Sequence, residues 1–181
     1  VVLNTHVPVD IVQVENPDEV IIATGGTTFT PPINGANQHH VVTANDILSG
    51  KEFFGKNVVV IGGGLVAAET AEYIATYNSK VAMIELSDEI LKGMDHHNRN
   101  VLMRNLKHHE VEMHTSSSVT EIKEDAVLYE HKGNQYKIEN VNTIVVAIGS
   151  KSLNKLESSL KASGISTKVI GDAAKVRNGI H

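Results

Sequence analysis

The sequence predicts an α/β protein with a central parallel sheet. Three observations indicate this class. The apolar run Val58–Ile61 is followed at once by glycines and a helical pattern of small residues. A second apolar run, Val81–Ile84, comes next, and strands that alternate with helices in this way form parallel sheets. Segment 119–138 then contains three short strand patterns separated by turns, which predicts an antiparallel meander.

The N-terminal region contains weaker patterns. The runs Val1–Asn4 and Ile11–Val14 read as two short strands around a turn at Pro8. The stretch Asp18–Gly26 predicts a buried strand that ends in a glycine turn. Phe29–Gly35 contains two prolines and a glycine, so we interpret it as an irregular linker.

Three helices are expected in the middle of the chain. Val41–Ser49 contains a short one, with Thr43 or Asn45 as its N-cap. The longer pattern from Gly64 to Asn78 has small apolar residues on one face. Asp95–Glu110 is the second clear helix, and its first residue is a suitable N-cap.

The remaining elements are mostly strands. Val111–His114 predicts a further strand, Thr143–Gly149 a return to the parallel sheet, Leu153–Ala162 a weak helix and Thr167–Asp172 the last strand. The three strands of the meander are expected at 119–123, 126–131 and 135–138.

The glycines after Val58–Ile61 form a dinucleotide-binding pattern in its required context of strand, turn, helix and second strand. Gly62 permits the tight turn, Gly64 lets a diphosphate approach the backbone, and Ala67 permits close packing of helix and strand. The N-terminus of the helix adds free N–H groups and a positive dipole end. The expected diphosphate contacts are the backbones of Gly62, Gly63, Gly64, Leu65 and Val66.

Glu85 stands at the end of the second strand, 23 positions after Gly62. About 20 residues is the spacing expected for the acid that hydrogen-bonds the adenosine ribose. Its carboxylate would repel a 2′-phosphate, and no arginine lies in the segment 86–92, so NAD is favoured over NADP. Glu69 reads either as a solvated helix carboxylate or as a group near the nicotinamide.

Two of the expected strands share one ending. Glu19–Gly25 and Thr143–Gly149 both close on Ala-x-Gly. Either buried parallel strands simply look alike, or the chain holds two related nucleotide-binding units, one inserted in the other. Gly149, at the end of the second of these strands, is a candidate cofactor contact.

The composition limits the possible functions. The 181 residues carry a net charge of −5 without a long basic run, which argues against nucleic acid or an anionic membrane as partner. No apolar stretch reaches the roughly 20 residues that span a bilayer. Cysteine is absent, so this chain holds no disulfide, iron–sulfur cluster or redox thiol pair, and a cytoplasmic location is expected.

Two further expectations come from the start of the chain and from its paired histidines. The chain starts at Val1 without methionine, and we expect it to be part of a longer protein. Adjacent histidines on a helix point in different directions, so a solvated surface is favoured over a metal site for the three histidine pairs, which are His39-His40, His96-His97 and His108-His109.

Three markers together resemble the pyridine nucleotide–disulfide oxidoreductase superfamily: Ala23-Thr24-Gly25, the Gly62 motif and Gly171-Asp172-Ala173. The chain is more closely similar to the C-terminal part of the NADH oxidase, enoate reductase and 2,4-dienoyl-CoA reductase branch. The stretches that carry this closer likeness are Thr43–Leu48, Ile90–Asp95 and Val169–Ala173.

The resemblance implies a Rossmann-like FAD/NAD(P)-binding fold. An NAD-binding domain at 46–150 would be inserted into an FAD domain, of which 1–45 and 151–181 are parts. Thr24 and Gly25 would lie near FAD, and Asp172 would hold its ribityl hydroxyls.

The resemblance also implies hydride transfer from NADH to FAD and onward to FMN and a 4Fe-4S cluster in an N-terminal flavin barrel of the same polypeptide. No side chain is expected to be catalytic in that step. The chain has no second Gly-x-Gly-x-x-Gly motif to bind the FAD diphosphate, so tight FAD binding is expected only in the full-length protein. The alternatives are a non-catalytic nucleotide-binding module, or a ferredoxin or rubredoxin reductase of the same superfamily.

Overall fold

The computed structural model describes residues 1–176 and divides the chain into two compact units. Unit 1 combines Val1–Thr27 with the segment from Ser150 onward, and unit 2 is Thr28–Gly149. Unit 2 is therefore an insertion in unit 1. Its first residue precedes the expected domain start at 46, because the linker and the strand after it pack in this unit. The assignment of the units to FAD and NAD remains a prediction.

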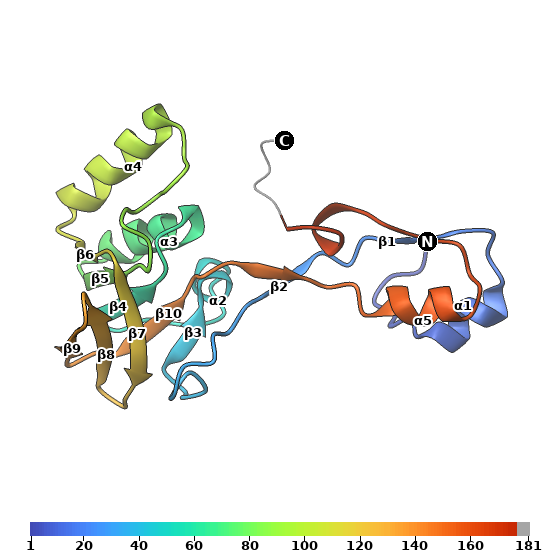
Figure 1. Cartoon of the computed structure of the whole chain (residues 1–181), viewed down its shortest axis with the longest axis horizontal. Coiled ribbons are helices and arrows are strands. Elements are labelled where there is room, and N and C mark those ends of the chain that lie inside the picture. The colour runs from blue at the N-terminus through green and yellow to red at the C-terminus, as the bar shows by residue number, and fades with distance from the viewer. Residues whose placement is uncertain (177–181) are drawn as a thin grey trace. The chain divides into compact units, whose positions relative to one another are not determined.

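Unit 2 is built on a five-stranded parallel sheet in the order β3-β10-β4-β5-β6 (Figure 1). In the register, Val59 pairs with Ala82 on one side and with Ile144 on the other. The predicted α/β class is thus confirmed. The strands are β3 (Val41–Thr43), β4 (Asn57–Ile61), β5 (Lys80–Ile84), β6 (Glu112–His114) and β10 (Thr143–Val146).

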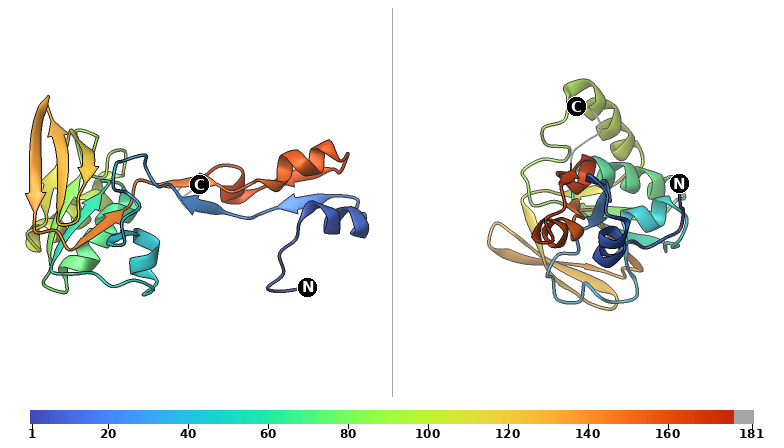
Figure 2. Two further views of the ribbon diagram at one scale, coloured as in Figure 1. Left: turned by 90° about the horizontal axis from the view of Figure 1, so that it is seen from below. Right: turned by 90° about the vertical axis from the view of Figure 1, so that its right-hand side faces the viewer.

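Each face of this sheet is covered by a different layer. The helices α2 (Ala44–Leu48), α3 (Leu65–Ala75) and α4 (His96–His108) share one hydrophobic cluster with one face of the sheet. The predicted meander packs on the other face and is drawn in yellow and orange in Figure 2. Its antiparallel strands are β7 (Ser117–Ile122), β8 (Ala126–His131) and β9 (Asn134–Glu139).

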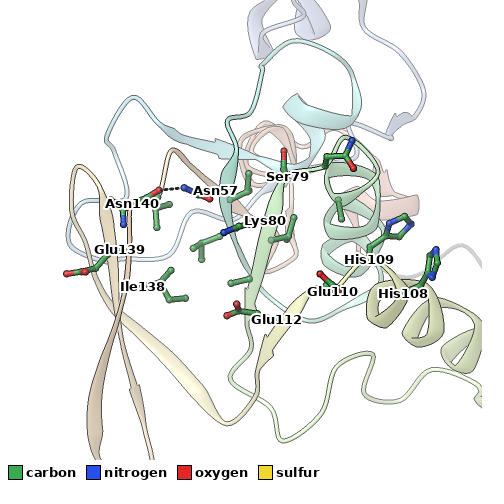
Figure 3. Close-up of a pocket in the computed structure, with 17 residues that line it drawn as sticks. Asn57, Ser79, Lys80, His108, His109, Glu110, Glu112, Ile138, Glu139 and Asn140 are labelled. Atoms are coloured by element: carbon green, nitrogen blue, oxygen red, sulfur yellow. Dashed lines mark hydrogen bonds between the residues drawn. The ribbon is translucent and has the colours of Figure 1, made fainter.

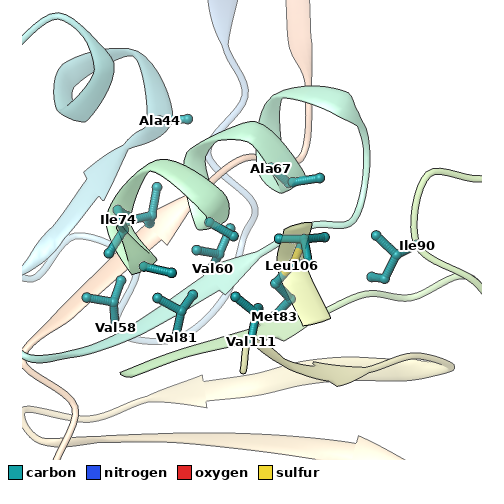
Figure 4. Packing of buried hydrophobic residues seen from close by; sticks show 14 of the residues in the cluster. Ala44, Val58, Val60, Ala67, Ile74, Val81, Met83, Ile90, Leu106 and Val111 are labelled. Atoms are coloured by element: carbon teal, nitrogen blue, oxygen red, sulfur yellow. The ribbon is translucent and has the colours of Figure 1, made fainter. Parts of the chain in front are cut away.

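Strand β4 shows why both layers are needed. Val58 and Val60 belong to the helix-side cluster, whereas Val59 and Ile61 belong to the meander-side cluster. Successive side chains of a strand point to opposite faces, so a continuous apolar run must be covered twice. Figure 4 shows α3 lying over the strands with Ala67 toward the core, where its small side chain permits a close approach.

Helix α4 begins at the predicted cap. Asp95 Oδ1 accepts from the N–H groups of His97 and Asn98 at 3.1 Å, and Asp95 Oδ2 accepts from Asn98 Nδ2 at 2.7 Å. The hydrogen bonds from Asn98 hold the pKa of this carboxyl below its usual 3.8. Leu102 and Leu106 then turn toward the core.

We expect Asp95→Ala to lower the melting temperature at neutral pH, because two helix N–H groups lose their acceptor. The folded pKa is depressed, so the cap contributes fully above the unfolded pKa of about 3.9 and is lost as the pH falls through the folded value. Melting curves from pH 7 to pH 3 measure this. The difference in melting temperature between the two proteins should narrow toward the acid end, and a difference that stays constant with pH would contradict the part of the prediction that depends on the charge of Asp95.

Unit 1 contains a short parallel pair, β1 (Val20–Ile22) and β12 (Thr167–Val169). The helices α1 (Val9–Glu15) and α5 (Leu156–Ala162) lie side by side and enclose a small core with the strands (Figure 2). That core contains Val12, Ile22, Leu160 and Ala173. A two-stranded sheet of β2 (Gly26–Thr28) and β11 (Ser150–Ser152), and the 3₁₀ turn η1 (Gly171–Ala173), complete the described elements.

Two local predictions were wrong. Ile11–Val14 lies in helix α1, and Val1–Asn4 is in no strand. Val12 is buried in the core of unit 1, and packing of this face outweighs the preference of a short Val/Ile run for a strand.

The segment 41–49 is divided rather than wholly helical. Its first three residues form edge strand β3 beside β10, and the helix starts at Ala44. Thr43 is its cap, since Thr43 Oγ1 accepts from the N–H of Asp46 at 3.1 Å. No helix within residues 1–176 is long and apolar enough to cross a membrane.

Candidate functional site

The glycine loop, Gly62–Gly64, lies where strand β4 ends and helix α3 begins. All five strands of the sheet are parallel, so the ends of β4, β5 and β10 meet at one edge, called here the carboxyl edge. From β4 the chain moves through α3 to β5 on one side, and it later returns to β10 on the other side. The loop therefore lies at the point where the strand order reverses, which is where open α/β sheets bind ligands.

Gly62 is required by the backbone. Its φ is +124°, and a Cβ built on it would lie 2.5 Å from the carbonyl oxygen of Ala147 in the loop after β10. The N–H of Gly62 donates to the carbonyl of Ile84 at 2.9 Å. The turn therefore depends on glycine for its conformation and for the close approach of β10.

We expect Gly62→Ala to destabilise unit 2 by about 2 kcal/mol or more, because it adds an unfavourable φ and a clash with backbone. Gly64→Ala is the matched control. Gly64 has an ordinary φ of −76°, and its Cβ would meet no described heavy atom within 4 Å. Urea unfolding of both variants measures the difference, and equal stabilities would contradict the argument.

The start of helix α3 is open for a ligand. Gly64 is the N-cap and provides no side-chain cap, and the first turn carries no acidic residue. The first N–H groups of a helix have no partner within the helix, and the dipole places positive charge there. Val66 in this turn is 46% exposed. This end of α3 therefore has the features of an anion-binding helix terminus.

Glu85 lies directly beside the glycine loop. A Cβ on Gly63 would lie 2.6 Å from Glu85 Cγ and 2.9 Å from Ile90 Cδ1, so glycine at this position makes room for both side chains. Glu85 is half-buried, and its backbone N–H donates to the carbonyl of His114 at the end of β6.

Gly149 lies beyond the end of β10, the strand that flanks β4 on the side opposite Glu85. Its φ is +102°, it is exposed, and its carbonyl accepts from the N–H of Phe29 at 3.1 Å. The structure thus brings the loop, Glu85 and the end of β10 to one edge of unit 2.

The remaining predicted residues lie in unit 1. Thr24 and Gly25 follow β1, Asp172 follows β12, and these two strands are parallel neighbours, so the three residues share one end of the pair. Thr24 Oγ1 donates to the carbonyl of Leu153, whose N–H donates to the carbonyl of Gly25 at 2.9 Å. Asp172 is exposed. Their contact with a flavin remains a prediction.

A hollow of unit 2 lies at the opposite edge of the sheet. This cavity of about 750 Å³ is bordered by the first residues of β4, β5 and β6, which are Asn57, Lys80 and Glu112, as Figure 3 shows. It is polar and open, and it lies far along the strands from the glycine loop. Within residues 1–176 no group of three or more histidine, aspartate or glutamate side chains is placed to hold a metal ion.

Sequence reasoning missed Ser87. Its N–H donates to Glu85 Oε1 at 2.7 Å, and its hydroxyl donates to the same oxygen. The sequence does contain a signal for this contact, which is a serine two positions after a carboxylate at the end of a strand. Such residues close local turns through backbone and side-chain hydrogen bonds. Nearby, Lys92 Nζ pairs with Asp88 Oδ1 at 2.8 Å, and this contact raises the pKa of Lys92.

The family model for pyridine nucleotide-disulphide oxidoreductases matches residues 9–173. An NADH oxidase of Thermoanaerobacter brockii is 38% identical over 166 residues, which is 89% of this chain and 26% of that protein. A cinnamate reductase of Clostridium sporogenes is 32% identical over 164 residues, 89% of this chain and 24% of that protein.

Among solved structures, a 2-naphthoyl-CoA reductase in complex with 2-naphthoyl-CoA superposes with a TM-score of 0.86 at 31% identity. The superposition covers 97% of this chain and 27% of that one. The chain thus spans about a quarter of the length of the proteins it matches. The family model matches most of the chain, and the motifs and the fold agree with it. The chain therefore belongs to the pyridine nucleotide-disulphide oxidoreductase family.

Proposed function

We propose that unit 2 is the NAD(H)-binding module of a flavin-dependent oxidoreductase. One observation carries this proposal: the glycine loop lies at the strand-order reversal, with open space over Gly64 and the Glu85 side chain against Gly63. A dinucleotide needs an accessible backbone for its diphosphate and an acceptor for its ribose hydroxyls, and both are present at this edge.

Each part of the site has a defined task. The amides of Gly63 to Val66 and the dipole of α3 bind the diphosphate, and Glu85 accepts a hydrogen bond from the adenosine ribose. The same carboxylate disfavours a 2′-phosphate. The first cation after Glu85 in the sequence, Lys92, is paired with Asp88, which reduces the positive charge it could offer to such a phosphate.

Unit 1 contributes part of an FAD site in the same proposal. Thr24 and Gly25 lie near the flavin, and Asp172 accepts hydrogen bonds from its ribityl chain. The sequence has only one Gly-x-Gly-x-x-Ala motif, at Gly62, so the diphosphate site for FAD belongs to the longer protein. When bound, the nicotinamide supplies a hydride and the flavin accepts it, while the chain orients both and excludes water.

The same proposal assigns the onward transfer of electrons to the rest of the longer protein. FMN and a 4Fe-4S cluster in an N-terminal flavin barrel would receive the electrons, and oxygen or an enoate-like substrate would be reduced. The names of the NADH oxidase and the cinnamate reductase support this range of acceptors. We also propose a cytoplasmic location, which the absence of cysteine supports.

Titration of the chain with NADH, followed by nicotinamide fluorescence, tests the binding step. We expect saturable binding of NADH, with NADPH binding at least about tenfold more weakly because of the charge on Glu85. No binding of either nucleotide would overturn the proposal.

A second experiment, which loads the chain with FAD, distinguishes an enzyme from a simple nucleotide-binding module. After addition of FAD and gel filtration, a yellow protein with absorbance near ~450 nm that NADH bleaches supports hydride transfer within this chain. A colourless protein that still binds NADH indicates a module that needs the rest of the polypeptide for flavin.

A further inference from the structure

The stem of the Glu85 side chain packs against the glycine loop. Its Cβ and Cγ lie against Gly63, where a Cβ would come within 2.8 Å and 2.6 Å of them. Gly63 is itself held, because its carbonyl accepts from the N–H of Leu91 at 2.7 Å. The stem of the glutamate therefore has little freedom to swing away from the glycine loop.

The two oxygens of the Glu85 carboxylate differ in their surroundings. Oε1 accepts from the N–H of Ser87 at 2.7 Å and from the Ser87 hydroxyl, and a carboxylate oxygen has two lone pairs with which to accept. Within residues 1–176 no hydrogen bond reaches Oε2. One oxygen is thus saturated by Ser87, and the other is left for a ligand.

Ser87 is anchored in turn by the other layer of the unit. Its carbonyl accepts from the N–H of Ser116 at 2.7 Å, and Ser116 lies in the turn between β6 and β7. The N–H of Ser117, the first residue of β7, donates to the carbonyl of Glu85 at 2.9 Å. The pair Glu85 and Ser87 is therefore held to the meander through its backbone, and the carboxylate is oriented before any ligand arrives.

We propose that Ser87 is a positioning residue that determines the recognition of the adenosine 2′-hydroxyl, by fixing Glu85 so that only Oε2 faces the ribose. The inference rests on the proposed function of unit 2. An oriented acceptor loses less freedom when a ligand hydroxyl binds, so its hydrogen bond contributes more to affinity. Without the Ser87 hydroxyl only the Ser87 N–H still holds Oε1, so the carboxylate gains rotational freedom and its contribution to the recognition of the 2′-hydroxyl falls.

The test compares NADH with its 2′-deoxyadenosine analogue. Nicotinamide fluorescence gives the dissociation constants of both for the wild-type chain, Ser87→Ala, Ser87→Thr and Glu85→Gln. A hydrogen bond to a charged acceptor corresponds to roughly 10- to 100-fold in affinity, so the wild type should bind the deoxy analogue that much more weakly. In Ser87→Ala we expect this ratio to fall at least about fivefold.

The matched variants separate positioning from folding. Ser87→Thr retains the hydroxyl and should restore the ratio, whereas Glu85→Gln should remove most of it. A merely structural role of Ser87 would weaken both nucleotides equally and leave the ratio unchanged, and that result would overturn the inference. So would a wild-type chain that does not distinguish the two nucleotides. Failure of the wild type to bind NADH at all would instead refute the proposed function.

Discussion

Gly64→Asp is expected to abolish NADH binding while leaving the chain at least as stable as the wild type. Gly64 is the N-cap of α3, its φ and ψ are −76° and −175°, and a Cβ there would meet no described atom within 4 Å. Aspartate is a preferred N-cap residue in this backbone region, so its carboxylate should bond the free N–H groups of the first turn. Those N–H groups are the proposed diphosphate contacts, and the added charge would repel the phosphates. We expect at least about a 100-fold loss of affinity.

Gly64→Asn is the matched control for this variant. Asparagine has nearly the same size and caps helices as well as aspartate does, but it has no charge. Fluorescence titration and thermal unfolding of both variants separate bulk from charge. Asparagine should weaken NADH binding less than aspartate. If the Gly64→Asp protein has the thermal unfolding curve and the NADH affinity of the wild type, the dinucleotide does not bind at the start of α3.

Glu85→Arg should exchange the nucleotide preference of unit 2. The substitution removes the ribose acceptor and introduces a guanidinium group beside Gly63, which suits bidentate binding of a 2′-phosphate. We expect NADH to bind about 10- to 100-fold more weakly and NADPH about tenfold more tightly. Parallel titrations with the two nucleotides measure the exchange.

Glu124→Arg provides the same change of charge at a distant position. Glu124 is exposed in the turn between β7 and β8, and β7 runs away from the carboxyl edge after Ser117. A general electrostatic effect would change the ratio of the NADH and NADPH affinities equally in Glu85→Arg and Glu124→Arg. If Glu85→Arg leaves the ratio of the NADH and NADPH affinities unchanged, Glu85 has no role in reading the ribose.

Much of unit 2 could be predicted because its signals are local. The apolar run of β4, the glycine loop and the small residues of α3 lie within one stretch of sequence, and each indicates its own element. The cap of α4 at Asp95 is equally local, since its partners are His97 and Asn98. The meander followed from the alternation of its strands and the turns between them.

Unit 1 was harder to predict because its elements are short. A run such as Ile11–Val14 fits a strand or one face of a helix, and burial of Val12 against Leu160 decided for the helix. Strands β2 and β11 have three residues each, and each depends on its partner from the far end of the sequence.

By itself, the sequence determined the α/β class, the order of the elements from β4 to β10, the glycine loop and the carboxylate at the end of β5. These features depend on interactions between residues a few positions apart, which periodicity and spacing report. Only the tertiary structure decided that β10 lies beside β4, that Gly63 makes room for Glu85, and that Ser87 occupies one of its oxygens. These depend on which strands and turns meet across the sheet, and pairing between distant segments leaves no local pattern to read.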